Sequence, residues 1–332
     1  MGVVVAAIMF VYNYSRIKVA RYAITGVNYQ SHVMRPPSVQ QLLREKGSDL
    51  YIVELQGYIF FGTAYTFVEQ IRQRLESPDL PPLRYILFDF RLVTGIDSSA
   101  TLSFSRLRQM VQGHEIHLVF TNLSDQVSQE WELELFGDAN DQEKFIFDNL
   151  DRGVAWCEEQ TINNFANSGQ ITKPKTLPQQ LASLLSSPLS SEDPLQEQQE
   201  TKIAERMNQY VHRLEFDTGQ CFLREGEEVA GLYFVEDGQV IAKGISESGQ
   251  ESELRLMQAG TVFGEIGIYT HLNATADVVA ATPGVLYYLS ARNLKHMDAE
   301  DPQLAVAFHR LIAGILGEKL AQTSRTVRAL QV

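Results

Sequence analysis

The hydrophobic pattern of this chain changes halfway along it, and that change restricts the fold to two unlike domains. Residues 17–160 alternate short apolar runs with amphipathic stretches. Residues 206–332 instead carry many short β-type runs separated by regularly spaced glycines. The segment between them, 161–205, is rich in Ser, Gln and Pro, a composition typical of a linker. The chain of 332 residues is long enough for a separate core in each half.

The first half predicts a sheet covered by helices. The runs RYILFDF and EIHLVFTN are short and continuously apolar, as expected for strands buried on both faces. Helices are expected over MRPPSVQQLLREKG (ended by Gly47), over TAYTFVEQIRQRLES (with Thr63 as its cap), over SATLSFSRLRQMVQG after a turn at VTGIDSSA, near DQVSQEWELELFG, and at the end of KFIFDNLDRGVAWCEEQ. Strands that alternate with helices indicate an α/β layer.

The second half predicts a small antiparallel barrel or jelly roll. The stretch LYFVEDGQVIAKG has the form of two strands joined by an Asp-Gly turn. Similar short runs recur between the glycines up to Ser290, which is the pattern of an all-β domain. Two helices are then expected, over SARNLKHM and over PQLAVAFHRLIAGILGEKLAQTSRTVRAL.

The N-terminus has an apolar run followed by basic residues. About a dozen uncharged residues precede Arg16, Lys18 and Arg21. Twelve helical residues rise roughly 18 Å, whereas a bilayer core is about 30 Å thick. The order, apolar and then basic, matches the cytoplasmic end of a transmembrane helix and is the reverse of a signal peptide. Residues 1–16 are therefore expected to be the end of such a helix or its remnant; the alternative is a buried N-terminal helix or strand.

Charge and composition exclude several functions. The formal net charge of -13 argues against a nucleic-acid partner, because phosphate backbones require clustered Lys and Arg. The two cysteines, Cys157 and Cys221, form neither a metal motif nor a disulfide framework. The seven histidines show no metal-ligand spacing, and no set of nucleophile, base and acid is evident. We therefore expect no enzyme and no metal site.

Three stretches of the first half resemble the STAS domain of sulfate transporters and anti-sigma-factor antagonists. They are YIVELQGYIFFGTA, RYILFDFRLVTGIDSSA and FIFDNLDRGVAWCEEQ, in matching order and spacing. Two of them, together with YSRIKVARYAITG, are most similar to the sulfate permease (SulP) branch. The resemblance covers 17–160 and implies a domain that docks on a membrane transporter or forms homodimers, at the cytoplasmic face of the membrane.

The second half is similar to cyclic nucleotide-binding domains. The resemblance rests on GQCFLREGEEVAGLYFVEDGQVIAKG and GTVFGEIGIYTHLNATADVVAATPGVLYYL. Together the two resemblances predict a STAS-type α/β sheet domain with helices, linked to a cyclic nucleotide-binding-type β jelly roll with flanking helices over 206–332.

The nucleotide cassette, residues 263–277, lacks the cation that the family uses. By resemblance, the Glu of an FGE element accepts from the ribose 2′-hydroxyl, and an arginine near the end of the cassette holds the cyclic phosphate. An alignment without gaps places Ala274 at the arginine position, and Asp277 adds a negative charge. Losing a bidentate charged hydrogen bond weakens binding by roughly tenfold to several hundredfold. The cassette residues that match the motif positions are Gly264, Glu265, Ile266, Ala274, Thr275 and Ala276.

Three alternatives therefore remain for the ligand of this cassette. The site has lost its ligand, it binds cAMP or cGMP through another group, or it binds a different small molecule. No other cofactor is implied by the sequence.

The element Asp97-Ser98-Ser99 lies between a predicted strand and a predicted helix. In the related anti-sigma antagonists the second serine of such an element is phosphorylated, which by resemblance would be Ser99. The other interpretation is that Asp97, Ser98 or Ser99 caps the helix by accepting from its first free N–H groups.

The leading hypothesis is a non-catalytic regulatory portion of a SulP-type sulfate or anion transporter. In it the STAS domain provides docking or dimer contacts, and the nucleotide-type domain is a regulatory module with a degenerate ligand site. The alternative is a free-standing STAS signalling adaptor with Ser99 as a phosphoswitch and a nucleotide sensor domain. A nucleotide-responsive transcription regulator is a third hypothesis, and it predicts salt-sensitive DNA binding.

Overall fold

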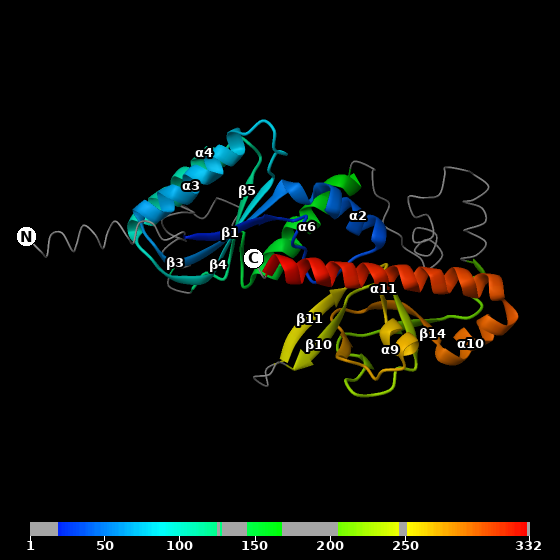
Figure 1. Ribbon diagram of the computed structural model, residues 1–332. Helices are drawn as coiled ribbons and strands as arrows, with labels where there is room; N and C mark the ends of the chain where they lie inside the picture. The colour runs from blue at the N-terminus through cyan, green and yellow to red at the C-terminus, as the bar shows by residue number, and fades with distance from the viewer. Residues whose placement is uncertain (1–18, 125–126, 128–144, 168–204, 246–250, 331–332) are drawn as a thin grey trace, which may run out of the picture. The chain divides into compact units, whose positions relative to one another are not determined.

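The computed structural model describes residues 19–124, 127, 145–167, 205–245 and 251–330 (Figure 1). The chain forms two compact units, which are described separately. The first consists mainly of residues 43–161, and the second of 32–42 with 162–324. Three expectations lie outside the described residues: the membrane-helix remnant at 1–16, nearly all of the helix near DQVSQEWELELFG, and residues 168–204 of the expected linker.

A five-stranded sheet forms the centre of the first unit. Its order is β1 (Ala20–Thr25), β3 (Leu50–Ile59), β4 (Tyr85–Ile96), β5 (His117–Thr121) and β6 (Ile146–Phe147). Strand β1 is antiparallel to β3, and the other neighbours are parallel. Successive residues of β4 enter opposite cores, with Ile86 and Phe88 on one face and Tyr85 and Leu87 on the other. This two-sided burial explains why the strand sequence is continuously apolar.

Helices cover both faces of this sheet. On one face, α3 (Phe61–Glu76) and α4 (Ser98–Val111) meet where the rings of Phe67 and Phe104 lie 5.2 Å apart. Both rings also contact Phe88 of β4. On the other face, Val154 and Cys157 of α6 (Leu150–Asn167) pack in one core with residues of β4 and β5. Helix α2 (Pro37–Lys46) ends before Gly47, as predicted. The α/β architecture of this half is thus confirmed.

Two local expectations in the first unit were wrong. Helix α3 begins at Phe61, so Thr63 is its third residue; the Thr63 hydroxyl still accepts from the Phe60 N–H, at 3.0 Å. The turn expected over VTGIDSSA also begins later than predicted. Strand β4 continues to Ile96, which pairs with Ile59 of β3. Parallel ladder hydrogen bonds outweigh the local turn preference of Thr-Gly there.

The second unit is a sandwich of two sheets, as the jelly-roll expectation required. One sheet has the order β2 (Val33–Met34), β11 (Glu251–Met257), β10 (Val240–Ile245), β13 (Asp277–Ala280) and β8 (Cys221–Leu223). The other has the order β12 (Val262–Phe263), β9 (Gly231–Asp237), β14 (Gly284–Ser290) and β7 (His212–Phe216). Strands β9 and β10 are joined through Gly238 at φ 83°, in the predicted Asp-Gly turn. Strand β2, which the sequence did not indicate, pairs in parallel with β11.

Among the described residues, helices follow strands of the second unit. The short α9 (Glu265–Thr270) follows β12, and α10 (Ala291–Glu300) and α11 (Pro302–Leu330) follow β14. Phe308 and Ile312 of α11 pack with Phe234 and Leu289 of the four-stranded sheet. Among the described helices, none combines the length and the apolar character needed to cross a membrane.

Candidate functional site

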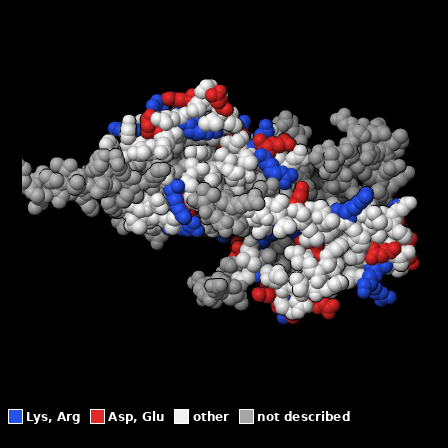
Figure 2. All heavy atoms as spheres, in the orientation of Figure 1, with Lys and Arg blue, Asp and Glu red and all other residues white. Residues whose placement is uncertain are grey.

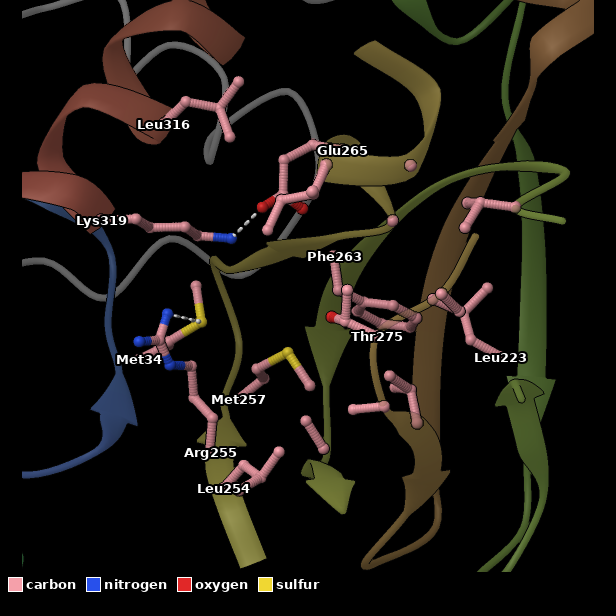
Figure 3. Close-up of a pocket in the computed structure, with 18 of the residues that line it drawn as sticks. Met34, Leu223, Leu254, Arg255, Met257, Phe263, Glu265, Thr275, Leu316 and Lys319 are labelled. Carbon is pink, nitrogen blue, oxygen red and sulfur yellow. Dashed lines mark hydrogen bonds and ion pairs between the residues drawn. The ribbon is translucent and has the colours of Figure 1, made fainter. Parts of the chain in front are cut away.

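A cavity of about 530 Å³ lies in the second unit (Figure 3). We call it the cassette pocket, because the nucleotide cassette forms one of its walls. Residues of β10, β11 and the middle of α11 form much of the remaining wall. The volume lies within the range of about 300–1,000 Å³ that is usual for small-molecule sites. Most of its surface is apolar.

The structure brings all of the predicted cassette residues to this pocket. Both groups line it: Gly264, Glu265 and Ile266 at the start of α9, and Ala274, Thr275 and Ala276 before β13. The position before α9 requires glycine, because its φ is 85° and an added Cβ would lie 2.5 Å from the Gly231 carbonyl oxygen. At this point the backbone of the cassette therefore closely approaches the backbone of β9.

Glu265 is buried and forms an ion pair with a lysine that the sequence analysis missed. The carboxylate is 3% exposed, and its Oε1 lies 2.6 Å from Nζ of Lys319 on α11 (Figure 3). The ammonium group also donates to the carbonyl oxygen of Val262, at 3.0 Å. Burial lowers the pKa of Lys319, while the neighbouring Glu265 carboxylate acts in the opposite direction. This pair ties α11 to the first residue of α9.

A second cation that the sequence analysis missed, Arg255 on β11, also lines the pocket. Its Nη1 lies 3.9 Å from Sδ of Met34, which is a weak contact. Within the part of the chain that the structure describes, no carboxylate forms an ion pair with this guanidinium, although Glu265 is near enough to raise its pKa. Burial has the larger effect and lowers the pKa of Arg255. Figure 3 shows Arg255 and Lys319 on the same side of the pocket, across from Leu223 and Thr275.

The sequence carried one signal for Lys319. Phe308 and Ile312 are buried, and Lys319 continues their stripe seven residues after Ile312, so a charge falls on the apolar face of an amphipathic helix. Such a charge requires a partner. The partner could not be identified from the sequence, because Glu265 is 54 residues away.

The polar groups at the end of the cassette bond to the neighbouring loop. The N–H of Ala274 donates to the carbonyl of Glu227 at 2.8 Å, and the Ala274 carbonyl accepts from the Gly226 N–H at 2.8 Å. The carboxylate of Asp277 accepts from the Glu225 N–H at 2.7 Å. Ala274 supplies no cation, so the charges that line this pocket come from α9, β11 and α11.

The Asp97-Ser98-Ser99 element lies at the start of α4 in the first unit. Asp97 is the N-cap, and its Oδ1 accepts from the Ala100 N–H at 2.9 Å. The Ser99 hydroxyl donates to the same oxygen at 2.6 Å and accepts from the Phe61 N–H at 3.0 Å. Ser98 is exposed. The hydroxyl of Ser99 thus joins the starts of α3 and α4.

Two properties of the described residues, their metal-ligating side chains and their surface charge, bear on catalysis and nucleic-acid binding. Among them, no group of three His, Cys, Asp or Glu side chains is arranged to hold a metal ion. On the face drawn in Figure 2, the described Lys and Arg side chains are interspersed with Asp and Glu. A continuous basic surface of the kind that phosphate backbones require is not seen on that face among these residues.

Comparison with protein-family models identifies both domains. Residues 41–152 match the STAS domain, and residues 213–301 match the cyclic nucleotide-binding domain. The chain therefore carries a STAS domain followed by a cyclic nucleotide-binding domain. Both kinds of domain are typically non-catalytic.

Similarity to characterised proteins covers most of the chain in one case and about half of it in another. Glutaminase 2 of Bradyrhizobium diazoefficiens is 26% identical over 312 residues, which are 94% of this chain and 46% of that protein. The vacuolar basic amino acid transporter VSB1 of Saccharomyces cerevisiae is 24% identical over 167 residues, or 48% of this chain and 16% of that protein. The chain thus spans less than half the length of these relatives.

Among solved structures, a cyclic nucleotide-binding domain from Methylobacillus flagellatus is similar, with 15% identity and a TM-score of 0.40. The similarity covers 46% of this chain and 83% of that one.

Proposed function

We propose that this chain is the non-catalytic regulatory portion of a SulP-type anion transporter. In this proposal the STAS domain makes docking or dimer contacts at the cytoplasmic face of the membrane. The cyclic nucleotide-binding domain changes the transport rate when its pocket or helix α11 changes state. Neither domain provides a path through a membrane, so the transported ion passes through another part of the assembly.

One observation carries this proposal: a STAS domain and a cyclic nucleotide-binding domain follow one another in a chain that is similar to a membrane transporter over 167 residues. The motif similarity of the first half to the SulP branch, and the apolar-then-basic order of residues 1–21, support the same assignment.

The proposal is tested by expressing the gene for this chain, with the coding sequence on its 5′ side, in a bacterial host that lacks sulfate uptake. We expect uptake of radiolabelled sulfate that is lost when residues 17–160 are deleted. Deletion of residues 206–332 should change the rate without abolishing it. No sulfate uptake by an intact, membrane-located gene product would contradict the proposal.

A second candidate comes from the similarity to Glutaminase 2. In this case the chain would belong to a protein that hydrolyses glutamine. The purified chain should then release ammonia from glutamine, or it should alter this activity in a larger protein that contains it. Our proposal predicts no ammonia release above the blank by the purified chain or by the larger protein that contains it, so measuring both separates the two candidates.

The signalling-adaptor alternative depends on phosphorylation of Ser99. A phosphate on this hydroxyl would lie beside the Asp97 carboxylate, 2.6 Å from the present oxygen, and would break the bond from the Phe61 N–H. Like-charge repulsion therefore opposes the modification, although the start of a helix favours an anion. Intact mass of the protein from its native host tests this alternative: unmodified protein alone would argue against it, and an added phosphate on Ser99 would support it.

A further inference from the structure

The cassette pocket carries an unbalanced positive charge. Three ionisable side chains line it: Arg255, Glu265 and Lys319. Glu265 and Lys319 neutralise each other as an ion pair at 2.6 Å. Among the described residues, the remaining guanidinium forms no ion pair with a carboxylate, and its one polar contact is with the Met34 sulfur at 3.9 Å. A half-buried cation in an apolar cavity is stabilised by a bound anion.

The rest of the pocket favours an apolar body over a sugar. Most of the walls are apolar and include Leu223, Val229, Ala242 and Val278. The uncharged polar side chains that line the pocket are Asn273, Thr275 and Thr323. Glu265, the group that would hold a ribose hydroxyl in the family motif, already accepts from Lys319. At the far end of the cassette, the N–H of Ala274 donates to the carbonyl of Glu227. The family's ribose acceptor is therefore already paired, and its arginine position, Ala274, has no cation.

We propose that the cassette pocket binds an organic monoanion with a largely apolar body, with its negative group on the Arg255 guanidinium. A carboxylate can accept two parallel N–H bonds from this group. Lys319 lies on the same side of the pocket, but its charge is balanced by Glu265, so Arg255 supplies the net positive charge. The site thus holds its anion from β11, not from the cassette position occupied by Ala274.

The pKa values of Arg255 and Lys319 are both lowered, which agrees with an excess of positive charge in the pocket. Burial lowers the pKa of Arg255 and of Lys319, so each charged form is less stable in the pocket than in water. A bound anion would stabilise both. The inference concerns the ligand of the second unit and holds whether or not the transporter proposal holds, because sulfate uptake and ligand binding are measured separately.

The role of Glu265 separates this site from a nucleotide site. If Glu265 held a ribose hydroxyl, Glu265→Gln would weaken binding. In the proposed site the same substitution removes the one negative charge among the pocket's ionisable groups and leaves Lys319 available to the anion. Glu265→Gln should therefore strengthen the binding of an organic anion severalfold. The two readings predict opposite signs for one substitution.

Calorimetric titration of the full chain tests the inference. The probes are octanoate and 1-octanol, which have the same chain length and differ in charge, with cAMP and cGMP as further arms. We expect octanoate to bind and to bind at least tenfold more tightly than 1-octanol. Arg255→Gln should weaken octanoate binding by about tenfold to one-hundredfold, because a charged hydrogen bond is lost. Arg292→Gln, which removes the same charge from the exposed start of α10, is the matched control and should change binding less than twofold.

Several results would overturn the inference. They are no octanoate binding at millimolar concentration, equal affinity for octanoate and 1-octanol, or octanoate binding that Arg255→Gln leaves unchanged. Tight binding of cAMP or cGMP that is insensitive to Arg255→Gln and lost in Glu265→Gln would show a nucleotide site instead. Arg255 forms no ion pair with a described residue, so its variant should fold; far-ultraviolet circular dichroism of each variant verifies this.

Discussion

The ion pair between Glu265 and Lys319 leads to a prediction about the stability of the second unit. Substituting Glu265→Gln keeps the shape of the side chain but leaves the Lys319 ammonium without its carboxylate. Removing one partner of a buried pair costs about 3–5 kcal/mol. Lys319 is 15% exposed and still donates to the Val262 carbonyl, so water and this bond reduce the loss. We expect the free energy of unfolding to fall by about 2–4 kcal/mol.

A double-mutant cycle isolates the contribution of the pair. Lys319→Met alone should also destabilise the protein, because Glu265 is 3% exposed and would lose its counter-charge. The double variant Glu265→Gln, Lys319→Met leaves no charge unpaired. It should be less destabilised than the sum of the single changes, by about 1–3 kcal/mol.

Urea unfolding followed by two optical signals shows which half of the chain the Glu265→Gln substitution destabilises. Both tryptophans, Trp131 and Trp156, precede residue 162, so their fluorescence follows the first half of the chain. Circular dichroism follows both halves. We expect the substitution to shift a circular-dichroism transition to lower urea while the fluorescence transition stays in place.

The pH dependence of the Glu265→Gln variant provides a further check. Burial lowers the pKa of Lys319 below its ordinary value of 10.5. The Glu265 carboxylate opposes this shift, so its removal lowers the pKa of Lys319 further. Between the two folded-state pKa values, the folded variant binds fewer protons at Lys319 than the folded unmodified protein does. The stability deficit of the variant should therefore shrink as the pH rises through that interval. A loss below 0.5 kcal/mol at pH 7, or additive single and double changes, would refute the reasoning.

Three other changes have defined outcomes. Gly264→Ala should lower the free energy of unfolding in urea by about 1–3 kcal/mol, because the new Cβ meets backbone at a residue with positive φ. Gly219 has the same φ of 85° but open space around it, so Gly219→Ala should lower the free energy of unfolding less. Asp97→Ala removes the cap of α4 and should lower the free energy of unfolding of the first unit by about 0.5–2 kcal/mol. Tryptophan fluorescence measures this loss. The control substitution Ser98→Ala should be close to neutral. Burial raises the pKa of the Cys157 thiol, so Ellman's reagent should titrate one thiol in the native protein and two in denaturant; two fast thiols would contradict the buried placement.

The cassette keeps the motif residues of the fold but lacks the cation that the family uses. Gly264 and Glu265 occupy the motif positions, and the backbone constraint at Gly264 is still present. However, the carboxylate of Glu265 forms an ion pair with Lys319 of α11, and Ala274 occupies the position of the family arginine. A ligand that disturbed the Glu265–Lys319 pair would also alter the attachment of α11. Under our proposal, ligand binding and the state of α11 would be linked through this pair, as a regulatory module requires.

Local sequence pattern determined the type and order of most elements. Continuous apolar runs, helical periodicity and the Asp-Gly turn are properties of a few adjacent residues, and they predicted the α/β sheet of the first half and the β sandwich of the second. The absence of a cation at Ala274 was also visible in the sequence. The exact ends of elements were not, as Thr63 shows: the start of α3 depends on where the neighbouring strand stops.

Tertiary structure alone decided which charges meet. Lys319 and Glu265 are 54 residues apart, and Arg255 and Met34 are 221 residues apart, so no local pattern relates them. Their contacts depend on how α11 packs against β12 and α9, and on the parallel pairing of β2 with β11. The charge balance of the pocket follows from that packing, because it is the packing that removes these groups from water and selects their partners.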